Sequence, residues 1–163
     1  MDELGIDRSI VMPTPNPPDL PNSLRAADLA MVAAAHPDRL WFMAGGGSLN
    51  VEIQRAVAGE VVDVDDFRDL ALSIVDAGAV GFGEFAGEHI VIGGEEPYVS
   101  APPDHPLFLV LADIAATEGV PIDLHMEAVP FDLPIPVPLA GAPNPSRSRL
   151  NSELTDCTLS DLP

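Results

Sequence analysis

The sequence contains no lysine, and arginine supplies all seven of its basic residues. Without lysine the chain has neither a Schiff-base nucleophile nor the phosphate-binding lysine of a Walker-type loop. The 26 acidic residues far outnumber the basic ones and give a formal net charge of −19. A surface of that charge repels nucleic-acid backbones and anionic lipids, so we expect no nucleic-acid partner and no membrane partner.

Cysteine is almost absent. The single Cys157 allows no internal disulfide and no thiolate-bound zinc cluster. The sequence also lacks an apolar run of about 18 residues and an N-terminal signal with a basic start and an apolar core. We therefore expect a cytoplasmic location. The 163 residues, 47% of them hydrophobic, are enough for one domain with a buried core.

What the sequence does contain is an alternation of short apolar runs with helical stretches. The apolar runs are typical of buried strands and cover residues 8–13, 40–44, 79–85 and 121–126. Helices are expected over residues 24–36, more weakly over 51–58, and over 65–77 and 106–118. Strands that alternate with helices predict right-handed crossovers and a parallel sheet, so the expected fold class is α/β.

The last part of the chain has a different composition. Residues 129–145 carry six prolines, which excludes a regular helix or a central strand. The residues after them show little periodicity. We therefore expect a folded unit over residues 1–128, followed over residues 129–163 by a proline-rich loop and a poorly ordered tail.

Two side chains that bind metals fall where predicted strands end. Glu84 follows the run “GFG”, and His125 ends the run “PIDLH”. In a parallel α/β sheet, ligands bind beyond the carboxyl ends of the strands. A carboxylate and an imidazole from neighbouring strands are two parts of a typical hydrolytic metal site. Taken alone, His125 also fits a hydrogen-bonded structural group, and Glu84 a solvated residue at a strand end.

The other histidines favour structural or surface roles. His105 stands at the start of a helix, and His36 stands at a helix end, where its charge suits the helix dipole. His89 falls in an expected loop and could line a pocket. The glycine-rich stretch over residues 44–50 lacks both the dinucleotide-binding spacing and the phosphate-loop lysine, so we interpret it as a flexible loop.

Several stretches, in this order, resemble the amidohydrolase-related family of metal-dependent hydrolases. They are “LGIDRSIVMPTP”, “AAHPDRLWFMAGGGSLN”, “GAVGFGEFAGEH”, “PPDHPLFLVLADIAATEGVPIDLHMEAVP” and “PNPSR”. The likeness covers Leu4 to Arg147 and is most specific over His105 to Pro130. Members of this family are (β/α)8 TIM barrels of the amidohydrolase superfamily. The resemblance implies that residues 1–128 are a partial metal-dependent hydrolase barrel, with about four parallel strands, the second to the fifth, and outer helices.

The resemblance also implies a ligand set for a divalent metal, with zinc the expected ion in full-length members. That set has a His-x-His pair after the first strand and a lysine or glutamate after the fourth. Histidines follow the fifth and sixth strands, and an aspartate follows the eighth. His125 matches the fifth-strand histidine, and Glu84 the fourth-strand position. The chain has no His-x-His motif, and the likeness ends at Arg147, before the sixth strand.

The resemblance implies a hydrolase in which a metal-activated water attacks an amide, ester or lactone carbonyl of a small-molecule substrate. Decarboxylation is the alternative chemistry, since relatives of this fold perform it on similar metal sites. Because most of the ligand set is missing, we expect this chain to be an incomplete, inactive fragment that binds metal weakly or not at all. A further alternative is a non-catalytic α/β remnant or interaction module. The open edges of a partial barrel also predict self-association.

Overall fold

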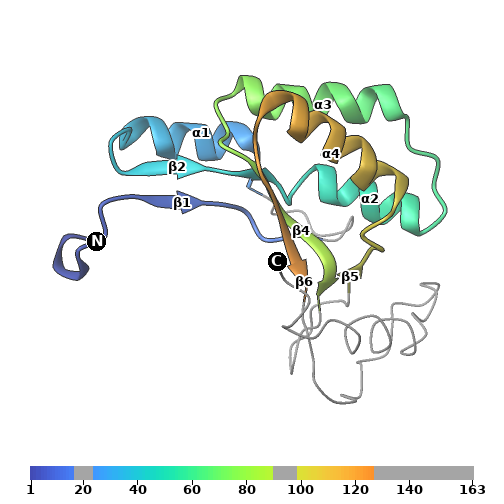
Figure 1. Cartoon of the computed structure of the whole chain (residues 1–163), viewed down its shortest axis with the longest axis horizontal. Coiled ribbons are helices and arrows are strands. Elements are labelled where there is room, and N and C mark those ends of the chain that lie inside the picture. The colour runs from blue at the N-terminus through green and yellow to red at the C-terminus, as the bar shows by residue number, and fades with distance from the viewer. Residues whose placement is uncertain (17–23, 90–98, 127–163) are drawn as a thin grey trace, which may run out of the picture.

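The computed structural model describes residues 1–16, 24–89 and 99–126 (Figure 1). These ranges form a mixed α/β fold. Its elements, in chain order, are the 3-10 helix η1 (Asp2–Leu4), β1 (Ser9–Val11), α1 (Ala26–Ala35), β2 (Leu40–Phe42), β3 (Ala44–Gly45), α2 (Leu49–Val57), α3 (Val64–Asp76), β4 (Phe82–His89), β5 (Val99–Ser100), α4 (Pro106–Glu118) and β6 (Ile122–Met126). The proline-rich loop and tail expected over residues 129–163 lie outside the described ranges.

The strands form two small sheets. In the first, β1 runs parallel to β2, and in the second β4 runs parallel to both β3 and β6. Only Met43 separates β2 from β3, so the parallel strands follow one another in the order of the sequence. The expected α/β class, and the parallel order of strands near residues 8–13, 40–44, 79–85 and 121–126, are therefore confirmed.

Two details of the strands differ from the sequence prediction. β4 continues to His89, so this histidine ends a strand and does not lie in a loop. The short β5 pairs antiparallel with the end of β4, where His89 lies beside Val99. That pairing brings together segments on either side of residues 90–98, and no local pattern in the sequence marks it.

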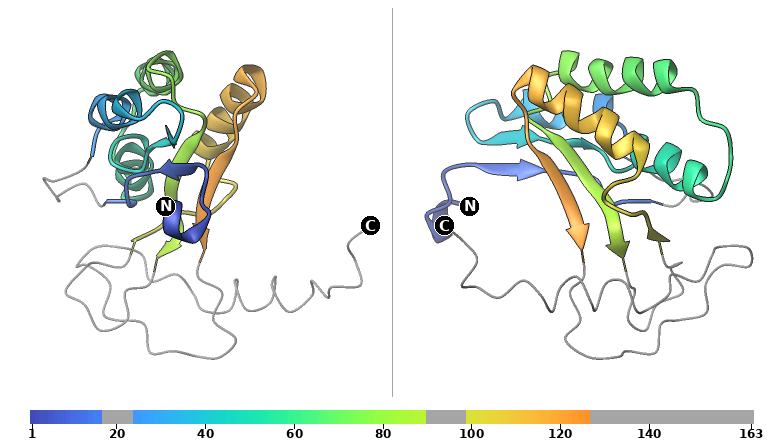
Figure 2. Two further views of the ribbon diagram at one scale, coloured as in Figure 1. Left: turned by 90° about the vertical axis from the view of Figure 1, so that its left-hand side faces the viewer. Right: turned by 45° about the vertical axis from the view of Figure 1, so that its right-hand side comes forward.

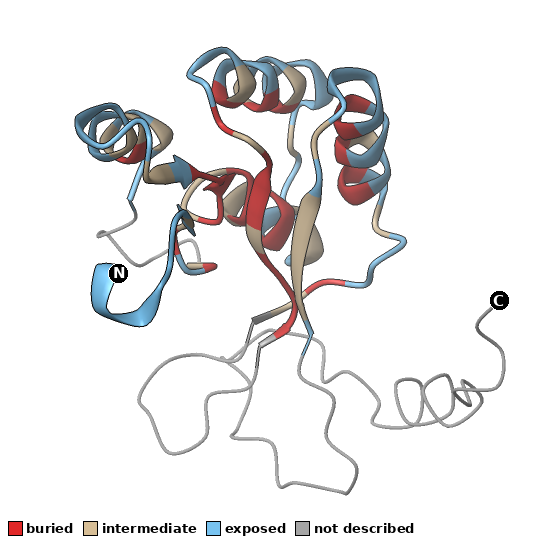
Figure 3. Cartoon of the chain, turned by 60° about the vertical axis from the view of Figure 1, so that its left-hand side comes forward, coloured by how far each residue is buried: buried red, intermediate tan, exposed pale blue. Residues whose placement is uncertain are grey.

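The helices lie together on one side of the strands, and the core fills the space between them (Figures 2 and 3). Phe82 and Phe85 of β4 are fully buried on that side, and the ring of Phe85 meets the ring of Phe108 on α4 edge-on, with centroids 5.9 Å apart. Phe67 on α3 and Leu111 on α4 are also fully buried. The large apolar side chains therefore concentrate where β4 meets α3 and α4.

The two longest helices begin at well-made caps. The Asp63 carboxylate accepts hydrogen bonds from the backbone nitrogens of Asp65 and Asp66 at 2.8 and 3.1 Å, which satisfies orphan donors of α3. His105 Nδ1 accepts from the backbone nitrogen of Leu107 at 3.3 Å at the start of α4. Gly119 ends α4 in the left-handed conformation, with φ 69°. These signals explain why the predicted boundaries of α3 and α4 were close to the observed ones.

The opposite side of the strands is the inner face. Side chains alternate along a strand, so the residues between those that face the helices point to this side. On β1 and β2 the inner face carries Ile10 and Trp41, which lie beside one another and are 43% and 41% exposed. The guanidinium of Arg8 lies 4.9 Å from the centroid of the Trp41 ring. On β6 the alternation assigns Asp123 and His125 to the same face.

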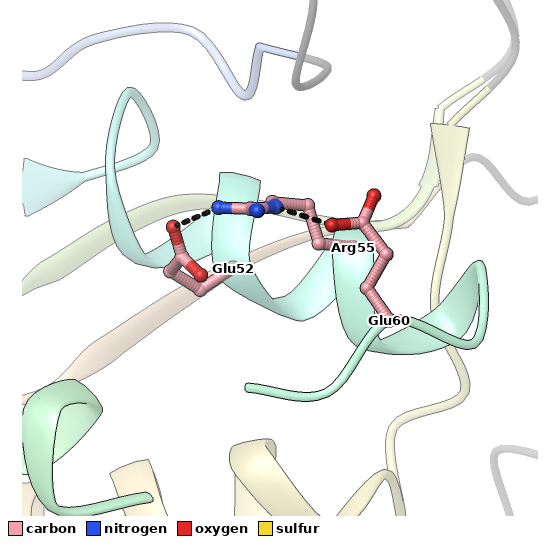
Figure 4. Close-up of polar contacts among 3 residues, drawn as sticks. All are labelled: Glu52, Arg55 and Glu60. Atoms are coloured by element: carbon pink, nitrogen blue, oxygen red, sulfur yellow. Dashed lines mark hydrogen bonds and ion pairs between the residues drawn. The ribbon is translucent and has the colours of Figure 1, made fainter. Parts of the chain in front are cut away.

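The clearest ion-pair cluster is on the surface of α2 and the residues just after it. On α2, Arg55 donates to Glu60 at 2.9 Å and to Glu52 at 3.3 Å (Figure 4). The hydrogen bond to Glu60, followed by the charges of Glu52 and Glu60, raises the pKa of Arg55 above its ordinary value. Exposed pairs of this kind contribute little to stability, so they do not explain the fold.

Within the ranges that the structure describes, no helix combines the length and the apolar character needed to cross a membrane.

Candidate functional site

A bulge in β4 sets the position of Glu84. Phe82 lies beside Ile122 of β6 and Phe85 lies beside Leu124, so β4 uses one residue more than β6 over this stretch. The extra residue lets Phe82 and Phe85 both face the helices, although they are three positions apart. Bulges re-aim side chains in this way next to functional sites. Glu84 is left free of the core and joins the inner face.

Close packing of β4 against β6 at this bulge requires a glycine. A Cβ atom on Gly83 would lie 2.8 Å from the Cβ of Asp123, closer than such atoms approach. The peptide bond between Gly83 and Glu84 is cis. Glycine at this position therefore permits the strand spacing on which the site depends.

Glu84 and His125 meet on the inner face, just past the carboxyl end of β3, where Gly45 lies beside Gly83. His125 is near the end of β6, as expected, but Glu84 is the third residue of β4 and does not end its strand, because β4 continues to His89. Glu84 Oε1 and His125 Nδ1 form a hydrogen bond, and the side chains are 22% and 28% exposed. The imidazole donates this bond when Nδ1 carries a proton. The structure thus brings together the two residues that the sequence singled out, on adjacent strands and within reach of solvent.

The backbone of Glu84 is held by the loop that follows β1. Its nitrogen donates to the carbonyl oxygen of Pro13 at 3.3 Å. Gly46 packs into the same junction: a Cβ atom there would lie 2.6 Å from the carbonyl oxygen of Glu84, 2.9 Å from that of Pro13 and 3.0 Å from that of Thr14. Because all three atoms belong to the backbone, the junction has no room for a side chain.

Two amides of α2 hold β4 beyond the end of β3. Asn50 is fully buried; its Oδ1 accepts from the backbone nitrogen of Ala86 at 3.0 Å, and its Nδ2 donates to the carbonyl of Asn16 at 3.1 Å. Gln54 Nε2 donates to the carbonyl of Ala86 at 3.4 Å. Buried backbone groups left without partners are costly, so these amides stabilise β4 at the residue that lies beside His125.

Sequence reasoning missed Asn50, Gln54 and Gly46. A signal for the amides was present, because Asn50 and Gln54 are one helical turn apart and each adjoins an apolar residue of α2, Leu49 or Ile53, that is fully buried. Polar residues on a buried helix stripe need hydrogen-bond partners. Nothing local identifies the backbone atoms that they bind.

Asp123 lies on the inner face next to the pair but not in it. Its side chain is half-buried and has no hydrogen-bond or ion-pair partner among residues 1–16, 24–89 and 99–126. In the same ranges, no group of three or more His, Cys, Asp and Glu side chains could hold a metal ion. The site therefore brings together two side chains of the kinds that can ligate a metal, Glu84 and His125.

Of the remaining histidines, His105 has the structural role expected for it. It caps α4, and burial lowers the pKa of its imidazole below the ordinary value, while the charge of Asp104 opposes that shift. His36 is exposed at the end of α1, as expected. The glycine-rich stretch over residues 44–50, interpreted from the sequence as a flexible loop, is instead strand β3, a tight turn over residues 46–48 and the start of α2. The backbone nitrogen of Ser48 donates to the carbonyl of Gly45 at 3.0 Å.

Comparison with known proteins returned no match: no family model, no curated protein and no solved structure resembles this chain closely enough to be counted as similar.

Proposed function

We propose that the described part of the chain corresponds to the second to fifth strands of a (β/α)8 barrel of the amidohydrolase type. Support comes from the strand order, since β1, the β2–β3 path, β4 and β6 neighbour one another in sequence and run parallel. The helices lie on one side of these strands, as the outer helices of such a barrel do (Figure 2). The corresponding activity is hydrolysis of an amide, ester or lactone in a small molecule.

The observation that carries this proposal is the contact between Glu84 and His125. A carboxylate and an imidazole from two adjacent parallel strands meet on the inner face, just past the carboxyl end of β3. In α/β barrels, ligands bind at the carboxyl ends of the strands. The bulge in β4 and the glycine at position 83 are the local features that allow the contact. In the proposed role the pair contributes two ligands to a divalent metal.

These two residues alone do not complete a catalytic zinc site. Such sites use three protein ligands and leave one position for water or substrate. The described residues offer only Glu84 and His125 at this place. We therefore assign to this chain a weak metal-binding pair and no reaction step, and we expect no hydrolase activity from these residues by themselves.

Zinc titration calorimetry on the full 163-residue chain tests the proposal. We expect weak binding of Zn²⁺ that is lost in His125→Ala and reduced in Glu84→Gln. His36→Ala is the matched control, because His36 is exposed at the end of α1 and away from the pair. Binding that survives in His125→Ala and disappears in His36→Ala would refute the assignment.

A non-catalytic role is the second candidate, and one observation favours it. Within the described ranges, the side-chain hydrogen bond of Glu84 goes to His125, and no third His, Cys, Asp or Glu side chain completes a metal-binding group with them. A hydrogen-bonded Glu–His pair of this kind also fits a structural link between β4 and β6. In that case the calorimetry would show no heat of Zn²⁺ binding, and His125→Ala would only lower the melting temperature.

A further inference from the structure

The two outermost parallel strands each have one edge without a strand partner in the described part of the chain. β1 pairs with β2 alone, and β6 pairs with β4 alone. An unpaired edge presents a row of backbone donors and acceptors that can bind another strand. One free edge is on β1, at the start of the strand order, and the other is on β6, at its end. The free edge of β6 in one copy could therefore pair with the free edge of β1 in a second copy.

Charges on the inner face are complementary at these two edges. Arg8, next to β1, contacts the Trp41 ring and has no carboxylate partner in the described ranges. Asp123, on β6, has no cationic partner there either, although it is half-buried. The chain has few basic residues, so an arginine available at one edge and a carboxylate available at the other form a specific match.

The strand register defines how the edges would meet. Ser9 of β1 lies beside Leu40 of β2. Four residues along the chain from Leu40, Ala44 of β3 lies beside Phe82 of β4, which in turn lies beside Ile122 of β6. If Ser9 of a second copy lies beside Ile122, the strand register shifts by four residues between β1 of the first copy and β1 of the second. Two copies then give eight, which is the shear of a closed eight-stranded α/β barrel.

The same register keeps every side chain on its proper side. Ser9 and Ile122 both face the helices, so Ile10 of the second copy lies beside Asp123 on the inner face. Arg8 of the second copy is then a diagonal neighbour of Asp123, within reach of a long side chain. A shift by one residue would turn each inner face outward, which makes this register self-consistent.

We propose that a second copy of this chain pairs its β1 with β6, and that two such contacts close a two-fold symmetric, eight-stranded ring. The inference rests on the partial-barrel fold proposed above and is independent of metal binding. Closure removes both free edges and covers Ile10 and Trp41, which are exposed in a single copy. A two-fold axis repeats the same contact twice, so the assembly ends at two copies.

Sedimentation velocity on the full chain is the first test. The expected species has twice the 17.1 kDa mass of one chain. Arg8→Asp and Asp123→Arg should each raise the dissociation constant of the dimer about tenfold, because each places like charges together. The double variant, Arg8→Asp with Asp123→Arg, should restore the dimer. A monomer, or open-ended aggregation of the unaltered chain, would overturn the proposal.

Disulfide trapping tests the register and does not depend on the charge variants. Cys157 is replaced by serine, and cysteines are introduced as Ser9→Cys with Ile122→Cys. Within one copy these positions are at opposite edges, while in the proposed ring they are adjacent strand neighbours. Oxidation should yield a covalent dimer. Ser9→Cys with Met126→Cys, which is four residues out of register, is the control, and equal trapping of both pairs, or of neither, would show that the contact is a different one.

Discussion

Two regions of this chain have the same kinds of elements but very different cores. In the first region, which comprises β1, α1 and β2, α1 buries only Leu29, and Ile10 and Trp41 remain exposed. In the second, which comprises β3 to β6 with α2 to α4, α4 alone buries five residues and β4 buries two phenylalanines completely. The candidate pair belongs to the second region.

The comparison teaches that the site is built where packing is dense. Glu84 lies within the bulge that lets Phe82 and Phe85 both pack in the core. His125 lies beside Ala86, which α2 holds by two hydrogen bonds. The first region contributes through backbone atoms of the loop after β1. We therefore expect substitutions in the second region to destabilise the chain much more than matched substitutions in the first.

The largest effect should come from Phe85→Ala. This change removes a fully buried ring that packs against Phe108, and it should lower the free energy of unfolding by about 3–5 kcal/mol. Trp41→Ala in the first region removes a half-exposed ring and its contact with Arg8, which should cost about 1 kcal/mol or less. Urea denaturation of both variants measures the difference, and equal losses would contradict the comparison.

The next effect should come from the junction of the two regions. Gly46→Ala places a methyl group among three backbone carbonyl oxygens, which can move only with the backbone that carries them, and should cost about 1–3 kcal/mol. Gly87→Ala is the control on β4, because the nearest atom there is Cγ of Met126, on an exposed and flexible side chain. Gly87→Ala should lower the melting temperature less than Gly46→Ala does. A larger decrease for Gly87→Ala would mean that the backbone around Gly46 can move to make room for a methyl group.

A smaller effect is expected at the helix starts. Asp63→Ala removes the side chain that caps α3 and should cost about 1 kcal/mol. Asp28→Ala in α1 removes a carboxylate that accepts from the backbone nitrogen of Arg25, and should cost about 0.5 kcal/mol or less. Both variants remove one negative charge near a helix start, so their difference in urea midpoint compares the Asp63 cap of α3 with the Asp28 capping bond of α1. A greater loss for Asp28→Ala would reverse the ranking of the two regions.

The smallest effect should be a pH dependence at the start of α4. Burial lowers the pKa of His105, so the unfolded chain binds a proton more readily than the folded chain. The contribution of His105 to stability is therefore complete above its ordinary pKa of about 6.5 and decreases as the pH falls through that value. A protonated Nδ1 also cannot accept the hydrogen bond from Leu107.

His105→Asn keeps a capping oxygen and does not titrate. Subtracting its unfolding free energy from that of the unaltered chain, between pH 5 and pH 8, should leave a difference that decreases toward acid pH. The unaltered chain and the His105→Asn variant have the same carboxylates. Subtracting one unfolding free energy from the other therefore removes the contribution of carboxylate titration. A difference that is constant across this range, or that grows toward acid pH, would show that His105 does not couple to folding in this way.

The order of the parallel strands could be predicted from the sequence because each strand is a short apolar run, and because α3 and α4 carry clear start and stop signals. His125 and Glu84 could be singled out because both follow such runs. The bulge in β4 could not be predicted, since it is a one-residue difference in register that arises when Phe82 and Phe85 pack together against the helices. Strand β5 and the bonds of Asn50 depend on contacts between residues ten or more positions apart.

Imidazole NMR during Zn²⁺ addition shows directly whether Glu84 and His125 bind the metal. The sequence has four histidines, so each ring can be assigned by single substitution. If the pair binds Zn²⁺, the resonances of His125 change first, ahead of those of the exposed His36 and the capping His105, and Glu84→Gln weakens the response. Resonances of His36 that change at lower Zn²⁺ concentration, with those of His125 unaltered, would contradict the proposed role of the pair.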